Sequence, residues 1–178
     1  MSRRRASSKG QAFEVIALEQ DRTLELGPLS LRTRADRVDR LADGSLAVID
    51  YKSGRHVGSQ GWFDDRLSEP QLPLYCLHEP GEVSATLLAR VRRDGPGCTF
   101  VGLSRTEDFA PGVVTPESRY EDTDWPRLLQ HWQAAIDELV AEIAAGRADP
   151  TPSPQACQYC DLGALCRVRD MLSEADDG

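Results

Sequence analysis

The sequence predicts an α/β (α+β) protein with a central mixed β-sheet flanked by helices. Two observations lead to this fold class. Several segments with strand patterning come first, then a short helical segment, then two more strands and a long amphipathic helix. In addition, turn signals rather than long helices separate most of the strands. This order is typical of one sheet packed against helices.

The first half of the chain predicts antiparallel strands. The polar pair Asp21-Arg22 resembles a connection between strands, and Asp43-Gly44 is a stronger hairpin signal. Strands are predicted at residues 13–19, 29–41 and 45–51.

The second half predicts two helices around two further strands. A short helix opens at Ser68-Glu69-Pro70-Gln71, with Ser68 as candidate N-cap. Strands over residues 83–91 and 98–103 surround a turn at 94–97, and a loop covers 109–121.

The most regular pattern predicts a helix over residues 124–145. Thr123 or Asp124 is its expected N-cap, and Gly146 its expected end. Its apolar stripe consists of Leu128, Leu129, Trp132, Ile136, Leu139, Val140 and Ile143.

Composition limits the class of protein. The 178 residues, of which 40% are hydrophobic and 28% charged, suit one globular domain. No apolar run is long enough to span a bilayer, and no export signal is evident, so a cytoplasmic location is expected. The net charge of −8 argues against a general nucleic-acid binder, although basic residues gather at 3–5 and 32–40. The expected organisation is a flexible basic segment (1–11), a core (12–148), and a Pro-rich linker with a cysteine-containing tail (149–178).

Asp36, Asp50 and Lys52 form the main candidate site. Asp50 and Lys52 are two residues apart on one strand, so they share a face, and the Asp43-Gly44 hairpin brings Asp36 beside them. Two carboxylates and an ammonium suit a hard divalent cation and a polarised water, as phosphodiester hydrolysis requires. The simpler interpretation is an Asp-x-Lys pair that keeps a strand end soluble.

Gln71 and Tyr75 form a second candidate pair. Because they lie four residues apart, they share one helix face and can reach a phosphate or the lysine. The alternative is a surface Gln beside a half-buried Tyr.

Cys157, Cys160 and Cys166 have Cys-x2-Cys-x5-Cys spacing. Clustered thiols in a chain without an export signal are usually metal ligands, and the alternative is three incidental thiols. A tetrahedral site needs a fourth ligand, for which the candidates are Cys76, Cys98, His78 and His131.

Taken together and in order, these segments resemble the PD-(D/E)XK nuclease domain of the RecB/AddB type, over roughly residues 12–168. The resemblance is carried by residues 36–41, 43–44, 48–54, 71–75 and 165–167, together with the cysteine triplet. It implies a restriction-endonuclease-like core with DNA as substrate. It also implies a helicase subunit or domain as partner, in DNA repair or recombination.

The resemblance also implies roles for individual residues. Asp36 and Asp50 would ligate Mg²⁺ (or Mn²⁺), and Lys52 would position the attacking water. Gln71 and Tyr75 match a motif that supports the active site and contacts DNA. The three tail cysteines match the last three ligands of a [4Fe–4S] cluster. The chain departs from the family at Thr33, where glycine is usual, and in the first motif, a helix with a metal-binding His or Glu that residues 1–12 do not contain.

Three functional hypotheses follow. The first is a metal-dependent deoxyribonuclease domain, favoured as an exonuclease. The second is a catalytically incomplete DNA-binding or scaffold domain without the first motif. The third is a zinc-binding structural module, in which a ligand such as His131 joins the three cysteines.

Overall fold

The computed structural model describes residues 5–6, 12–54, 58–91, 97–150, 157 and 160–166. The chain divides into two compact units, Met1–Val140 and Ala141–Gly178. Most of the expected basic N-terminal segment and most of the turn predicted at 94–97 lie outside the described residues.

The first unit contains one mixed sheet, as predicted. Its described strands follow the order β1-β2-β3-β4-β5-β6-β7. Pairing is parallel between β4 and β5 and between β6 and β7, and antiparallel elsewhere. The strands are β1 (Arg5–Ala6), β2 (Ala12–Leu26), β3 (Leu29–Leu41), β4 (Leu46–Lys52), β5 (Val83–Val91), β6 (Cys98–Ser104) and β7 (Val113–Val114).

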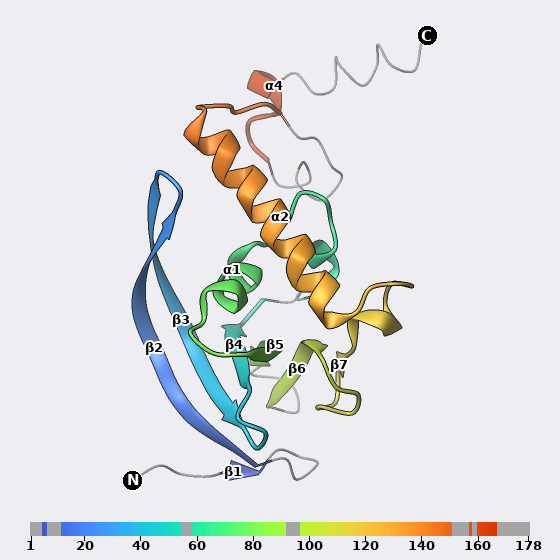
Figure 1. The fold of residues 1–178 in the computed structure, drawn as a ribbon. Helices are drawn as coiled ribbons and strands as arrows, with labels where there is room; N and C mark the ends of the chain where they lie inside the picture. Colours follow the sequence, from blue (N-terminus) through green and yellow to red (C-terminus); the bar gives the residue numbers. More distant parts are fainter. Residues whose placement is uncertain are drawn as a thin grey trace. The chain divides into compact units, whose positions relative to one another are not determined.

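The β2–β3 hairpin is longer than predicted (Figure 1). The turn expected at Asp21-Arg22 is absent, because Asp21 pairs with Arg34 and Arg22 with Thr33 within the ladder. The chain reverses instead at Gly27, whose φ of 57° suits glycine. Polarity misled the prediction, since an exposed ribbon carries polar residues as readily as a turn does.

The sheet has an apolar cluster on each face. One includes Ala47, Ile49 and Leu87 and continues into Phe109 and Val113. The other is larger and includes Val38, Val48 and Leu88. It is covered by α1 (Gln71–His78) and by the part of α2 (Trp125–Ala144) that lies in the first unit. Both helices therefore pack on the face from which Val48 projects.

Tryptophan side chains pack helix α2 and a short 3₁₀ helix, η1 (Gln60–Trp62), against this core. Trp132 Nε1 donates to the Trp62 carbonyl at 2.8 Å, and Trp125 Nε1 donates to the Val83 carbonyl at 2.9 Å. These bonds satisfy indole groups that would otherwise be buried without a partner.

The helix starts differ in how well they were predicted. Ser68 does not cap α1, which begins after Pro70, and its hydroxyl lies 3.5 Å from Asp64 Oδ2 instead. Asp124 does cap α2, since its Oδ1 accepts the Arg127 N–H at 2.8 Å. The loop predicted at 109–121 also contains β7 and a 3₁₀ helix, η2 (Pro116–Ser118).

The second unit contains the end of α2 and a short helix, α4 (Gly163–Cys166). As predicted, Gly146 ends α2: its φ is 65°, and its N–H donates to the Ile143 carbonyl at 3.0 Å. Within the described part of the chain, no helix is both long and apolar enough to cross a membrane.

Candidate active site

The end of β4 carries Asp50 and Lys52. Alternation along the strand places both on the face that bears Val48, so Asp50 is buried and Lys52 reaches the surface. Lys52 Nζ lies 2.9 Å from Asp50 Oδ2. The strand thus delivers a buried carboxylate and a half-exposed ammonium to one place.

Asp36 lies where the β3–β4 ladder ends. The last paired residues are Arg37 and Ile49, and Asp36 is the next residue of β3. Its Oδ2 accepts the Tyr51 N–H at 2.8 Å. A side-chain hydrogen bond therefore joins β3 to β4 just beyond the last backbone pair. The hairpin therefore brings Asp36 to the end of β4, as predicted from the turn at Asp43-Gly44.

Helix α1 brings Gln71 and Tyr75 to the same place. The Gln71 amide joins the charged pair, with Nε2 3.0 Å from Asp50 Oδ1 and Oε1 3.3 Å from Lys52 Nζ. Gln71 Nε2 also lies 3.3 Å from the Tyr75 hydroxyl, which donates to the Arg34 carbonyl at 3.0 Å. The structure thus connects four of the five predicted residues in one network and places Asp36 next to it.

A pocket of about 320 Å³ opens beside this network. Glu69 lines it and was not predicted as a site residue. Its position two residues before Gln71 could have indicated that it lies near the site. The sequence around Glu69 by itself predicts only the start of a helix. The full lining consists of Asp50, Lys52, Trp62, Glu69, Pro70, Gln71, Leu72 and Leu88.

Burial and charge shift the pKa values of the site. Burial raises the pKa of Asp50, the negative charge of Asp36 adds to the rise, and Lys52 opposes it. Burial lowers the pKa of Lys52, but the charges of Asp50, Glu69 and Asp36 outweigh burial and leave it raised. One ammonium therefore faces more negative charge than it neutralises, which favours a further cation.

The two carboxylates of the site are a partial set of metal ligands, which is the kind of set that magnesium uses in proteins. Asp50 Oδ2 is buried and lies 2.9 Å from the Lys52 ammonium. In the described ranges, no group of three or more His, Cys, Asp or Glu side chains could hold a metal ion. Magnesium is commonly held by one or two carboxylates plus substrate phosphates. Asp36 and Asp50 match that donor set.

The tail cysteines are not gathered as expected. Cys157 and Cys160 are exposed, Cys166 is half-buried, and no metal-binding group among the described residues includes them. The Cys-x2-Cys-x5-Cys spacing therefore stays a prediction of metal binding that the described residues do not support.

The structure also shows the surroundings of the four candidates for a fourth metal ligand. Burial raises the pKa of Cys76 to about 12, which keeps it a thiol, and Cys98 is exposed. Ring nitrogens of His78 and His131 lie within hydrogen-bond distance of the Leu74 and Asp64 carbonyls. None of the four belongs to a metal-binding group in the part of the chain that the structure describes.

Comparison with known proteins supports the resemblance. The chain is 29% identical to the Gene 69 protein of Mycobacterium phage L5, over 85% of this chain and 44% of that protein. For the Gene 69 protein of phage D29, the identity is 31%, over 85% of this chain and 48% of that protein. The chain thus spans about half the length of these curated relatives.

A shorter stretch resembles a helicase-associated nuclease. Over 66 residues, the chain is 44% identical to an ATP-dependent helicase/deoxyribonuclease subunit of Streptococcus equi subsp. zooepidemicus (strain MGCS10565). The match covers 36% of this chain and 6% of that protein.

The family assignment rests on a longer match. The family model described as the PD-(D/E)XK nuclease superfamily matches residues 1–167, which include Asp36, Asp50, Lys52 and the Gln71–Tyr75 pair. The chain belongs to the PD-(D/E)XK nuclease superfamily.

Proposed function

We propose that this chain is a divalent-metal-dependent deoxyribonuclease domain that hydrolyses phosphodiester bonds, with exonuclease action. We further propose that it works in DNA repair or recombination in the cytoplasm, beside a helicase subunit or domain. The observation that carries the proposal is the network in which Gln71 contacts both Asp50 and Lys52 at the wall of a pocket, next to Asp36. The helicase partner is suggested by the short similarity to a helicase/deoxyribonuclease subunit.

Each residue has a proposed role that follows from its chemistry. Asp36 and Asp50 would hold the divalent ion, which supplies Lewis acidity and activates water when bound. The raised pKa of Lys52 keeps its ammonium charged at neutral pH, so Lys52 stabilises negative charge on the phosphate rather than removing a proton.

Gln71 and Tyr75 position the charged groups. The Gln71 amide donates to Asp50 and accepts from Lys52, so it holds the two side chains at a defined separation. Tyr75 ties Gln71 to the main chain of β3 through the Arg34 carbonyl.

Lys52→Ala tests the proposal. Linear DNA with a fluorophore at one end is incubated with the full chain and Mg²⁺ or Mn²⁺, with EDTA as the metal control, and closed circular DNA tests the need for an end. We expect metal-dependent release from linear DNA by the wild type and a loss of about 100-fold or more in the variant. Circular dichroism should be unchanged, because the Lys52 side chain is half-exposed.

The matched control is Arg105→Ala, which removes a surface cation paired with Asp43 and Glu82. Its activity should equal that of the wild type. Full activity of Lys52→Ala would remove the lysine from the mechanism.

A second candidate is a DNA-binding domain without catalysis. It is favoured by the lack, within the described residues, of any three-ligand metal group. A folded wild-type chain that binds labelled DNA in Ca²⁺ but never cleaves it in Mg²⁺ or Mn²⁺ would establish this candidate and reject the first.

We also propose that Cys157, Cys160 and Cys166 bind an iron–sulfur cluster. Their Cys-x2-Cys-x5-Cys spacing supports this proposal, and cluster binding would have to draw the thiols together.

A further inference from the structure

We propose that the ion pair between Arg22 and Glu79 is a positioning clamp that sets the place of Asp36 relative to Lys52. The proposal rests on the nuclease function proposed above. Arg22 lies in β2 and Glu79 directly follows α1, and neither is among the residues that carry the family resemblance.

One side of α1 contacts three successive strands. Gln71 bonds to Asp50 of β4, and Tyr75, one turn later, bonds to the Arg34 carbonyl of β3. Glu79, a further turn along, receives Arg22 of β2. Gln71 and Tyr75 share one helix face, and Glu79 directly follows the last residue of α1. The helix and the residue after it therefore contact β4, β3 and β2 in turn.

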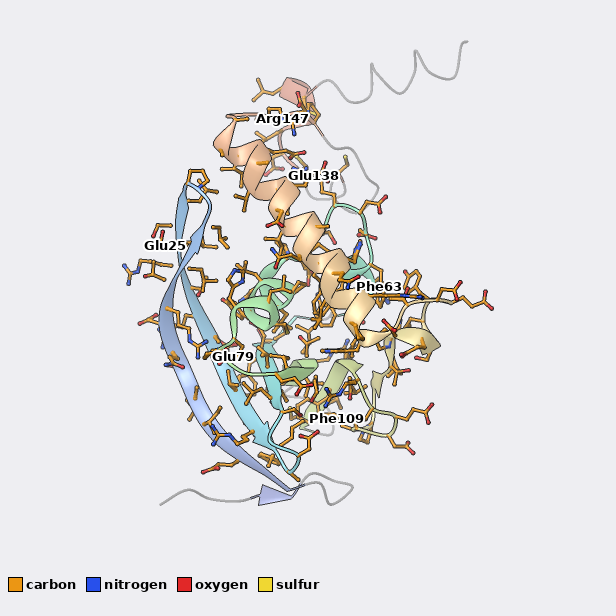
Figure 2. All side chains as sticks on the ribbon, in the orientation of Figure 1. Glu25, Phe63, Glu79, Phe109, Glu138 and Arg147 are labelled. Atoms are coloured by element: carbon orange, nitrogen blue, oxygen red, sulfur yellow. The ribbon has the colours of Figure 1, made fainter. Side chains whose placement is uncertain are left out.

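The Arg22–Glu79 contact is well built. Arg22 donates from NH1 to Glu79 Oε2 at 2.7 Å and from NH2 to Oε1 at 2.8 Å. The Glu79 side chain is 4% exposed and that of Arg22 is 23% exposed. Figure 2 shows Glu79 on the side of α1 that faces the hairpin. A bidentate pair whose carboxylate is buried fixes both the distance and the orientation of the two side chains.

The Arg22–Glu79 pair lies beside the part of β3 that has no backbone pairing with β4. The described ladder between β3 and β4 covers only Arg37–Arg40 opposite Leu46–Ile49. Before Arg37, the described backbone pairing of β3 is with β2 alone. This stretch includes Arg34 and Asp36, and side-chain hydrogen bonds from Tyr75 to Arg34 and from Tyr51 to Asp36 take the place of a ladder with β4. Arg22 lies opposite Thr33, the neighbour of Arg34, so the Glu79 and Tyr75 contacts hold the ribbon at one level. Loss of the Arg22 contact should let this stretch move relative to β4.

The competing explanation is a pair that only stabilises the fold. The test therefore compares Arg22→Ala, Glu79→Ala and the charge-reversed double variant Arg22→Glu/Glu79→Arg with the wild-type chain. Arg40→Ala is the matched control, because it removes an exposed Arg–Glu pair within the β2–β3 hairpin, to which Arg22 also belongs. Three quantities are measured: kcat and KM for labelled DNA with Mg²⁺, the midpoint of thermal unfolding, and amide hydrogen exchange.

We expect each single variant to lower kcat by about 10-fold or more, because small misplacements of catalytic groups are costly. KM should stay within about twofold, and the charge-reversed variant should recover most of the lost kcat. Exchange should rise in α1 and around Asp36 while β5 stays protected. The control should match the wild type in all three measurements.

Two results would overturn the clamp. One is unchanged kcat and unchanged exchange in α1 in a folded Arg22→Ala chain. The other is faster exchange throughout the sheet together with a lowered midpoint, which would make the pair a general stabiliser. If the wild type cleaves nothing, the nuclease proposal fails, but the exchange pattern still decides whether the pair positions α1 and β3.

Discussion

Two buried aspartates of this chain have opposite surroundings. Asp39 receives two hydrogen bonds from Arg37, at 2.7 and 2.6 Å, so its charge is fully compensated. Asp50 shares Lys52 with other acids, and burial raises its pKa. A carboxyl whose pKa is higher in the folded than in the unfolded chain stabilises the fold below its unfolded pKa, and this stabilisation is lost as pH rises through the folded pKa. Ionised Asp50 therefore costs stability at neutral pH, even with the attraction of Lys52 included.

Asp50→Asn should therefore make the fold more stable and abolish activity. Without metal at pH 7, the free energy of unfolding should rise by about 1 kcal/mol, and the gain should shrink as pH falls toward the acidic range. Mg²⁺ should raise the unfolding midpoint of the wild type but not of the variant, which should also be inactive. Urea unfolding at several pH values measures this.

The matched substitution is Asp39→Asn, which should destabilise the chain by about 2 kcal/mol because it removes the charged, bidentate acceptor of the half-buried Arg37 guanidinium. A destabilised Asp50→Asn chain at pH 7 would contradict the argument.

At the scale of elements, the register of β6 depends on a missing side chain. Gly102 lies between β5 and β7, opposite Leu87 and Val113. A Cβ at this position would lie 2.2 Å from the Thr86 carbonyl oxygen and 3.0 Å from Leu87 Cα. Both atoms belong to the backbone of β5, so they can move only if the strands separate.

Gly102→Ala should therefore lower the free energy of unfolding by about 2–3 kcal/mol. Gly81→Ala is the control, because its added Cβ would meet only the Cδ1 and Cγ atoms of the Leu46 side chain, which can move. The control should cost less than about 1 kcal/mol. Thermal or urea unfolding compares them, and equal losses would show that backbone proximity at Gly102 is not the cause.

At the scale of the whole molecule, the cysteine-containing tail contributes no residue to the proposed hydrolysis of DNA, and its own proposed role is to bind an iron–sulfur cluster. The described structure shows Cys157 and Cys160 exposed and no three-ligand group. If the three thiols bind an iron–sulfur cluster, anaerobic reconstitution with iron and sulfide should produce a visible absorption band and an iron content proportional to protein.

Cys160→Ser should abolish that absorption, whereas Cys98→Ser, at the start of β6, should leave it unchanged. A colourless chain that retains stoichiometric zinc would instead support the structural-module hypothesis.

Sequence alone determined much of this protein. Local patterns predicted β3 and β5 to the residue, the Asp43-Gly44 hairpin, and α2 with Thr123 or Asp124 as its cap, of which the structure has Asp124. Strand alternation and the hairpin predicted that Asp36, Asp50 and Lys52 would converge, and helical spacing predicted that Gln71 and Tyr75 would share one face of α1. These features depend on neighbours in sequence, whose geometry the backbone sets directly.

Tertiary structure decided the rest. The length of β2 follows from pairing with β3, which outweighs the polarity of Asp21-Arg22. The pocket position of Glu69 and the pairing of Glu79 with Arg22, 57 residues away, depend on where α1 packs. The raised pKa of Asp50 depends on burial, and the exposure of Cys157 and Cys160 depends on how their segment folds. None of these quantities is a property of local sequence, because each is set by groups that only the folded chain brings together.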